Sequence, residues 1–382
     1  MNTLFWILLA TVLYVYAGYP LLLVLMRAVG AARPIAIGSS EPHITLIISA
    51  FNEEDVIADK LRDSLKLDYA RDRLQIIVVS DASDDSTDRI VTEFQSQGVE
   101  LLRMPDRGGK TAGLNAAVPI ARGEVVVFSD ANALYMRDAL RKLVRNFADP
   151  TVGAAVGESG YTAPVVESER SESLYWRYET ALKRLESDIG SVVGGDGAIY
   201  AIRKPLYIPM RADAISDFVN PLQIVKSGYR CVYESEARSY ERAADNFDKE
   251  FRRKVRIVNR AWRGLFSMSS LLNPFRFGFF SLELVSHKLL RWNVLALLIG
   301  LLIANVLIVD QGLIYRLALL GQLMFYVAAF TGYAFRRRRR MPAVLSVPYF
   351  FCLVNVASAI GIIDAFRGKT YTTWTTARAK AN

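Results

Sequence analysis

The feature that most constrains this chain is its long stretches without charge. No charged residue occurs from Met1 to Met26, and a helix of about 20 apolar residues is long enough to cross the hydrocarbon core of a bilayer. The stretch also lacks the basic start and the small-residue cleavage site of a secretory signal peptide. We therefore expect residues 1–28 to form a retained N-terminal transmembrane anchor.

Three further uncharged stretches occur near the end of the chain, at residues 292–309, 317–335 and 341–363, each about the length of one crossing. The composition agrees, because 52% apolar residues with 22% charged residues is too apolar for an ordinary soluble domain. We expect residues 292–366 to form transmembrane helices. Residues 265–291, rich in phenylalanine with few charges, predict one amphipathic helix at the membrane interface.

The net charge of +9 is concentrated at residues 252–263 and 336–340 rather than spread evenly, which argues against nucleic-acid binding. Arg27 follows the first apolar stretch. Basic clusters beside spans remain on the cytoplasmic side, so the central segment is expected to face the cytoplasm at the inner or plasma membrane of a bacterium-like cell. A fourth full crossing would place Arg367 and Lys369 outside. The last stretch is therefore either re-entrant or an exception to the rule.

Between the spans, a linker at residues 29–42 precedes a segment at 43–264 with globular composition and alternating strand and helix patterns. Such alternation builds a mostly parallel α/β sheet whose ligands bind at the carboxyl ends of the strands. We expect strands at 43–49, 74–80, 99–103 and 124–129, with helices at 53–67, 83–97 and 110–121. Later in the segment we expect helices at 167–189, 216–227 and 245–264 and a strand at 197–203.

Polar residues gather where these strands end. The first strand ends in Ala50-Phe51-Asn52-Glu53 and the second in Ser80-Asp81. In Gly108-Gly109-Lys110 the glycines let the backbone approach an anion, and the following helix N-terminus and the lysine favour negative charge. The alternatives without a role in binding are that Asn52 caps a helix and that Lys110 is a solvated surface lysine.

Two acidic positions are suited to catalysis. Asp130 and Asn132 follow the fourth strand, and their oxygen atoms suit a hard cation such as Mg²⁺. Asp217 follows Ser216 at a predicted helix start, where a carboxylate can act as a general base or merely cap the helix. Asp213 is its nearby competitor.

In their order along the chain, these motifs resemble membrane-bound glycosyltransferases of family 2, the inverting group that includes cellulose, chitin and hyaluronan synthases and has a GT-A fold. The resemblance implies an enzyme that uses Mg²⁺ or Mn²⁺, with Asp217 as the general base. It also implies a metal bound by Asp130 and Asn132, and acceptor contacts by Asp196 and Trp262. The implied nucleotide-sugar contacts are Ala50, Asn52, Glu53, Asp81, Lys110, Asp130, Asn132, Arg253 and Arg256.

The chain departs from the family pattern at several positions. Asn132 and Ser216 stand where the family usually has acids, and residues 253–257 depart from its Gln-x-x-Arg-Trp motif, with Arg253 in place of Gln and Ile257 in place of Trp. The Trp stacks on the acceptor sugar in polymerising members, so Ile257 leaves processivity open. Trp374 and Arg378 resemble a C-terminal pattern of membrane-bound members.

The sequence thus predicts transfer from a UDP-sugar to a saccharide or polyprenyl-linked acceptor beside membrane lipid, with a homo-oligomer or an export partner as a further possibility. The alternative is a catalytically silent nucleotide-binding scaffold of a polysaccharide synthesis or export complex. The departures at Asn132, Ser216 and Ile257 are its support.

Overall fold

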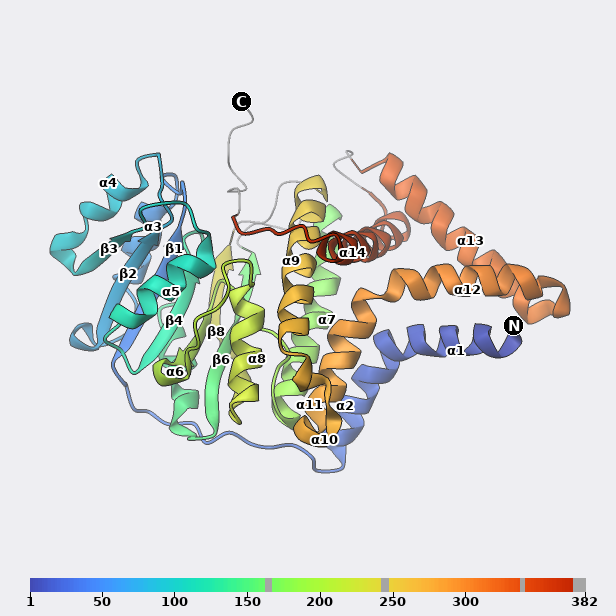
Figure 1. Cartoon of the computed structure of the whole chain (residues 1–382), viewed down its shortest axis with the longest axis horizontal. Coiled ribbons are helices and arrows are strands. Elements are labelled where there is room, and N and C mark those ends of the chain that lie inside the picture. The colour runs from blue at the N-terminus through green and yellow to red at the C-terminus, as the bar shows by residue number, and fades with distance from the viewer. Residues whose placement is uncertain (162–166, 242–246, 337–340, 374–382) are drawn as a thin grey trace.

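The computed structural model describes residues 1–161, 167–241, 247–336 and 341–373, and these form an α/β body with a group of long helices on one side (Figure 1). The described residues of the body contain one sheet of 8 strands in the order β3-β2-β1-β4-β7-β6-β8-β5. The strands are β1 (Ile44–Ala50), β2 (Leu74–Ser80), β3 (Val99–Arg103), β4 (Val125–Asp130), β5 (Leu134–Tyr135), β6 (Val152–Tyr161), β7 (Tyr200–Arg203) and β8 (Arg230–Glu241).

The predicted parallel half of the sheet is confirmed. Strands β3, β2, β1 and β4 pair in parallel, and every residue of β1 is buried, as expected for a strand covered on both faces. Helices α3 (Ile57–Ser64), α4 (Thr87–Thr92) and α5 (Lys110–Ile120) connect these strands. The helices α3 and α4 are shorter than expected, because residues after β1 and β2 form strand-end loops instead.

The other half of the sheet is mixed rather than parallel. Strand β7 is antiparallel to β4 and β6, β6 is parallel to β8, and β5 is antiparallel to the end of β8. Of these strands, the sequence predicted only the one at 197–203, observed as β7. Strand β6 is rich in small residues and β8 carries acidic residues, so neither shows the apolar pattern typical of a buried strand.

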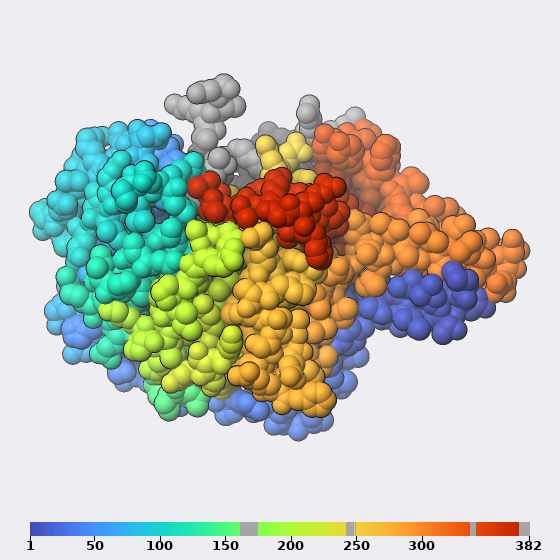
Figure 2. Space-filling view, in the orientation of Figure 1, coloured from blue at the N-terminus to red at the C-terminus, as the bar shows by residue number. Residues whose placement is uncertain are grey.

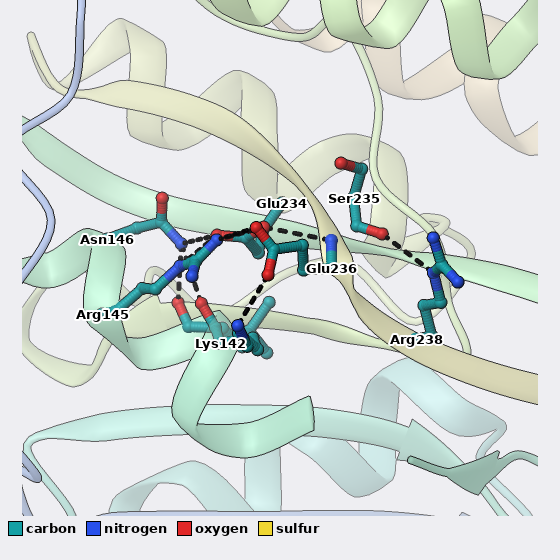
Figure 3. A network of polar contacts seen from close by, with 8 residues as sticks. Lys142, Arg145, Asn146, Glu234, Ser235, Glu236 and Arg238 are labelled. Atoms are coloured by element: carbon teal, nitrogen blue, oxygen red, sulfur yellow. Dashed lines mark hydrogen bonds and ion pairs between the residues drawn. The ribbon is translucent and has the colours of Figure 1, made fainter. Parts of the chain in front are cut away.

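A network of ion pairs explains how β8 carries its charges (Figure 3). Arg145 donates to both carboxylate oxygens of Glu234, at 2.8 and 3.0 Å, and to Glu236 at 2.9 Å. Lys142 and Asn146 contact the same two carboxylates at 2.6 and 3.0 Å. Because Lys142 lies on α6 (Ala139–Val144), the network fixes β8 against this helix.

Three longer helices lie between the sheet and the apolar helices: α7 (Glu167–Ile189), α8 (Ser216–Lys226) and α9 (Phe247–Ser267). The single interfacial helix expected at 265–291 is instead a series of short helices. Pro274 and Gly278, the latter at φ +57°, interrupt it. The pieces are η6 (Ser269–Leu272), α10 (Pro274–Phe277), α11 (Phe279–Leu284) and η7 (Val285–Leu290).

Four helices among the described residues are long and apolar enough to cross a membrane. The first, Asn2–Ala28, joins α1 (Asn2–Leu13), η1 (Tyr14–Gly18) and α2 (Tyr19–Ala28). The others contain α12 (Val294–Ile308), α13 (Leu313–Ala334) and α14 (Ala343–Phe366). Figure 1 shows α1 and α12 running side by side away from the body, whereas α14 is seen nearly end-on beside α9. One span before the α/β body and three after it agree with the expected arrangement.

Candidate functional site

A cavity of about 1250 Å³ lies beyond the carboxyl ends of β1 and β4 and extends between α7, α9 and α14. It brings together residues from distant parts of the sequence. The predicted site residues that line it are Glu53, Lys110, Asp130, Asn132, Asp196, Asp217, Arg253 and Arg256.

Three charged groups of the cavity converge at Gly197. Lys110 Nζ donates to Asp130 Oδ1 and, at 3.1 Å, to the carbonyl oxygen of Gly197. A methyl group at Gly197 would lie 3.3 Å from both Asp217 Oδ2 and Lys110 Nζ, and 3.6 Å from Asp130 Oδ2. The predicted cation, metal ligand and general base therefore surround one point, where a side chain larger than that of glycine would be in tight contact with them.

Asp217 lies in the first turn of α8, and its carbonyl oxygen accepts a hydrogen bond from the Gly195 amide at 2.6 Å. Burial raises the pKa of Asp217, Lys110 opposes this rise, and the neighbouring Asp196 and Asp130 add to it. A raised pKa makes this carboxylate a stronger proton acceptor, which suits a general base.

Asp213, the competitor, lies elsewhere. Arg263 donates to its Oδ2 at 2.7 Å, and Arg211 contacts its Oδ1 at 3.1 Å. Although burial acts to raise the pKa of Asp213, these two guanidinium groups hold it below its usual value. Asp213 lines a second cavity and not the one that contains Asp217, so the geometry favours Asp217 as the base.

The strand ends expected at the nucleoside are held by mutual hydrogen bonds. Asp81 is 1% exposed, and its carboxylate accepts from the amides of Gly108 and Gly109 at 2.8 to 3.0 Å. Asn52, at φ +52°, donates to Asp84 Oδ1 at 2.5 Å and accepts from the Asp84 amide at 3.0 Å. Asn52 therefore joins the ends of β1 and β2 instead of capping a helix.

Ala50, Asn52 and Asp81 are not among the described residues that line the cavity. Ala50 is 1% exposed at the end of β1, and its carbonyl oxygen accepts from the Asp81 amide at 2.9 Å. These residues shape the loops beside the cavity. Their contact with a nucleoside remains a prediction.

Helix α9 provides the basic wall of the cavity. Arg253, Arg256 and Arg260 are spaced by three and four residues, which places them on one helix face, and all three line the cavity. Burial lowers the pKa of Arg256, and the neighbouring Arg253 adds to this effect. The two cations predicted to bind a diphosphate thus share one wall.

Arg260 was not predicted. Its Nε donates to the carbonyl oxygen of Asp213 at 3.2 Å, and its Nη2 donates to Thr111 Oγ1 at 3.2 Å and to the carbonyl oxygen of Ala214. Thr111 Oγ1 also donates to Ala214 at 2.7 Å. Arg260 therefore fixes the segment that leads into Asp217. Its spacing of four from Arg256 is the sequence feature that could have found it.

Glu241 was also missed. It is the last residue of β8 and lines the cavity. Burial and the nearby carboxylates of Asp130 and Asp196 raise the pKa of Glu241 to about 7. Because β8 itself was not predicted, no sequence feature placed Glu241 at the site.

Trp262, predicted to contact the acceptor, lies outside the catalytic cavity. It lines the second cavity, of about 760 Å³, and packs against Phe266, Trp292 and Phe366 with ring centroids 4.7, 6.3 and 5.8 Å away. Trp262 follows Arg256 by six residues, which turns the direction of its side chain by about 240° around the helix axis. Trp262 therefore does not share the cavity-facing side of Arg256. The structure does not support its predicted role. Trp374 and Arg378 lie outside the described residues.

The metal prediction rests on Asp130 and Asn132, which both line the cavity. Within the described ranges, no group of three or more His, Cys, Asp or Glu residues could hold a metal alone. One carboxylate and one amide oxygen nevertheless fit Mg²⁺ or Mn²⁺ bound jointly with phosphates, because Mg²⁺ commonly takes one or two carboxylates plus substrate oxygens. Asp130 and Asn132 therefore fit a metal ion that also binds phosphate oxygens of a substrate.

Comparison with known proteins agrees with this architecture. Over 96% of its length, the chain matches 99% of a solved structure of the mannosyltransferase PcManGT from Pyrobaculum calidifontis in complex with GDP-Man and Mn²⁺, with a TM-score of 0.74 and 22% identity. At this identity the match establishes the fold, which is GT-A-like as expected. The described sheet and helices are those of that fold.

Among characterised proteins, the chain is 34% identical over 132 residues to β-monoglucosyldiacylglycerol synthase of Synechocystis sp. strain PCC 6803. It is 29% identical over 116 residues to poly-β-1,6-N-acetyl-D-glucosamine synthase of Staphylococcus aureus strain MSSA476. These matches cover 32% and 30% of this chain, and only 27% and 28% of the two relatives. Residues 45–205 match the family described as Glycosyl transferase family 2. This segment, which is less than half of the chain, is similar to that family and supplies Lys110, Asp130 and Asp196 to the cavity.

Proposed function

We propose that the protein transfers a sugar, with inversion, from a UDP-sugar to a hydroxyl group of an acceptor presented at the membrane. The observation that carries this proposal is the extent of the cavity. Tyr16 of the first candidate span and Phe351 and Val354 of α14 line the same cavity as Lys110 and Asp217. A single space thus joins the catalytic groups to helices suited to lipid.

The residues of the cavity have two tasks in this reaction. Lys110, Arg253 and Arg256 bind the diphosphate of the donor as fixed cations, and Asp217 accepts the proton of the attacking hydroxyl. Mg²⁺ or Mn²⁺ held by Asp130 and Asn132 would supply positive charge that stabilises the departing diphosphate.

The position of Asp196 supports a role beside the acceptor. Its Oδ1 accepts from the Ala198 amide at 3.2 Å, and its Oδ2 lies 3.9 Å from Lys183 Nζ of α7. It lines the cavity next to Gly195, whose amide binds the backbone of Asp217. We infer that Asp196 contacts the acceptor sugar or headgroup.

The acceptor is best sought among lipids and lipid-linked saccharides, because the cavity reaches the apolar helices. A relative named as a glucosyldiacylglycerol synthase and another named as a polysaccharide synthase are both compatible with this site. The basic residues Arg27 and Arg336 follow candidate spans, which favours a cytoplasmic position for the α/β body. The silent-scaffold alternative gains nothing from the geometry, because Lys110, Asp130 and Asp217 are brought together.

The test uses the full chain in detergent with Mn²⁺ or Mg²⁺, UDP- and GDP-sugars, and a lipid extract as acceptor. Released nucleoside diphosphate and labelled lipid are measured. Asp217→Asn should lower transfer by about 10²- to 10⁴-fold, the usual contribution of a general base, while donor binding persists. Asp213→Asn is the matched control and should retain transfer within a few-fold. Wild-type turnover that is unchanged in Asp217→Asn would contradict the proposed base, and absence of turnover with every donor would favour the scaffold.

A further inference from the structure

We propose that α14 does not cross the membrane but lies along its surface, against the catalytic domain. The described part of the chain then crosses three times, and residues 367–373 remain on the side of the catalytic domain. Length and hydropathy alone make α14 resemble the other three candidate spans. Its contacts distinguish it from them.

The other three candidate spans each have one end at the domain and one end away from it. At the distal end, Phe5 of α1 packs with Leu301 and Ile308 of α12, and its ring lies 5.3 Å from that of Tyr315 at the start of α13. At the domain end, the first span packs on α7 from Tyr16, whose carbonyl oxygen accepts from Tyr178 at 3.2 Å, to Arg27, which forms a salt bridge of 3.1 Å with Asp188. Its first part, α1, extends beyond these contacts. This geometry is typical of helices that leave the domain and reach the far side of a bilayer.

Helix α14 touches the domain along most of its length. The ring of Phe350 lies 5.9 Å from Tyr175 of α7, and that of Phe366 lies 5.8 Å from Trp262 of α9. Between them, Asn259 of α9 donates to the carbonyl oxygen of Gly361 at 3.2 Å. Sixteen residues of helix span about 24 Å. A helix that crossed the bilayer would have left the domain over that distance.

The chain after α14 returns to the catalytic domain at once. The carbonyl oxygen of Lys369 accepts from Asn259 at 3.2 Å, and Tyr371 and Thr373 line the catalytic cavity. The carbonyl group of Thr372 lies so close to Gly109 that a methyl group there would not fit. Figure 2 shows these red residues reaching from α14 to the surface of the α/β body.

The distances leave no room for a crossing at either end. Five extended residues reach at most about 18 Å, which is less than the hydrocarbon thickness of about 30 Å. Arg367 and Thr372 are five residues apart, so α14 ends on the side of the domain. Arg336 lies 3.9 Å from Asp248 of α9. Ala343, the first residue of α14, follows Arg336 by seven residues, which reach at most about 25 Å, so α14 also begins on the side of the domain.

The exposed surface of α14 is apolar, whereas most of its polar residues are buried. Its buried polar residues, Ser346, Asn355 and Ser358, are 1 to 4% exposed and face the protein. Its exposed large side chains are apolar. They are Val344, Val347, Ile360, Ile363 and Phe366, at 37 to 76% exposure. An exposed apolar surface is more stable beside acyl chains than beside water. The partner of this surface is therefore phospholipid.

This arrangement also removes the conflict with the distribution of basic residues. With three crossings, Arg27, Arg336, Arg367 and Lys369 all lie on the side of the catalytic domain. Against these four stands Arg316 at the distal end, paired with Asp310, so the excess of basic residues agrees with the positive-inside rule.

Labelling of single cysteines in sealed membrane vesicles tests the proposal. Arg62→Cys marks the domain side, Asp310→Cys marks the distal side, and Ala343→Cys and Arg367→Cys mark the two ends of α14. A membrane-impermeant maleimide is added before and after lysis. Both α14 positions should react from the same side as Arg62→Cys and from the opposite side to Asp310→Cys. Reaction of either position from the Asp310→Cys side would overturn the proposal.

The background carries Cys352→Ser, while Cys231 remains because it is fully buried. A second measurement does not depend on cysteine. Ile360→Lys on α14 should preserve yield and membrane association, because an interfacial lysine reaches water. The matched Val327→Lys, in the middle of α13 and 64% exposed, should lower yield several-fold. Equal loss in both variants would place Ile360 in the bilayer interior and contradict the proposal. Neither result depends on sugar transfer.

Discussion

Lys60 offers a prediction whose size follows directly from its surroundings. This lysine of α3 is 0% exposed. Its ammonium group donates to the carbonyl oxygen of Ala133, in the turn after Asp130 and Asn132, and lies 3.9 Å from the centre of the Tyr135 ring. Burial lowers the pKa of Lys60 to about 7, although Asp63 and Asp130 oppose the shift.

The sign of the pH dependence follows from this lowered pKa. The unfolded chain holds the proton of Lys60 up to a pKa of about 10.4, whereas the folded chain releases it near pH 7. Between these values the unfolded state binds more protons, so the free energy of unfolding rises with pH. From pH 7 to pH 9.5 the expected gain is about 3 kcal/mol, at 1.36 kcal/mol per pKa unit.

The assay is thermal unfolding of the full chain in detergent at pH 7 and pH 9.5, for wild type and Lys60→Met. The methionine removes the titrating group, so the unfolding temperature of Lys60→Met should rise less than that of the wild type between pH 7 and pH 9.5. The substitution leaves the carbonyl group of Ala133 without its hydrogen-bond donor, which lowers the free energy of unfolding by about 1–3 kcal/mol at both pH values. Lys142→Met, which breaks the partly exposed ion pair with Glu236, is the control and should keep the wild-type response. An equal rise in unfolding temperature from pH 7 to pH 9.5 in wild type and Lys60→Met would refute the reasoning.

Two further outcomes follow from the cavity. Arg260→Met should lower kcat/KM by at least about tenfold, because charge-assisted hydrogen bonds worth about 1.5–3 kcal/mol each hold the segment before Asp217. Arg260→Lys should retain part of the activity. Steady-state kinetics of Arg260→Met that match the wild type would refute this. Glu241→Gln should weaken the pH dependence of stability between pH 5 and 7. The folded pKa of Glu241, about 7, exceeds its unfolded value, so the wild type loses up to about 2 kcal/mol over that range as the pH rises, and an identical pH profile of thermal unfolding in Glu241→Gln would contradict the assignment.

Much of the first half of the fold could be predicted from sequence, because its information is local. Strands such as β1 are continuous apolar runs, and their ends carry polar residues in short motifs. Parallel strands with helical crossovers place those ends at one edge. Lys110 and Asp130 could therefore be placed together before the sheet itself was known.

The second half depends on contacts that are distant in sequence. Strand β8 pairs with β6 and β5, and its Glu234 and Glu236 bind Arg145, about 90 residues away. Glu241 reaches the cavity only because that strand exists. Trp262 was misplaced because its distance along the chain from Arg256 was considered without its direction around the helix.

Asp217 shows how the two halves make one site. On α8 it has no local feature that separates it from Asp213, four residues earlier. What distinguishes them is the strand-end loop that brings Lys110 beside Asp217, whereas Arg211 and Arg263 bind Asp213. Arg260 reaches across both positions and fixes the backbone between the two aspartates. The geometry favours Asp217 as the base because its neighbours leave it facing a cavity, while Asp213 is already paired with arginine.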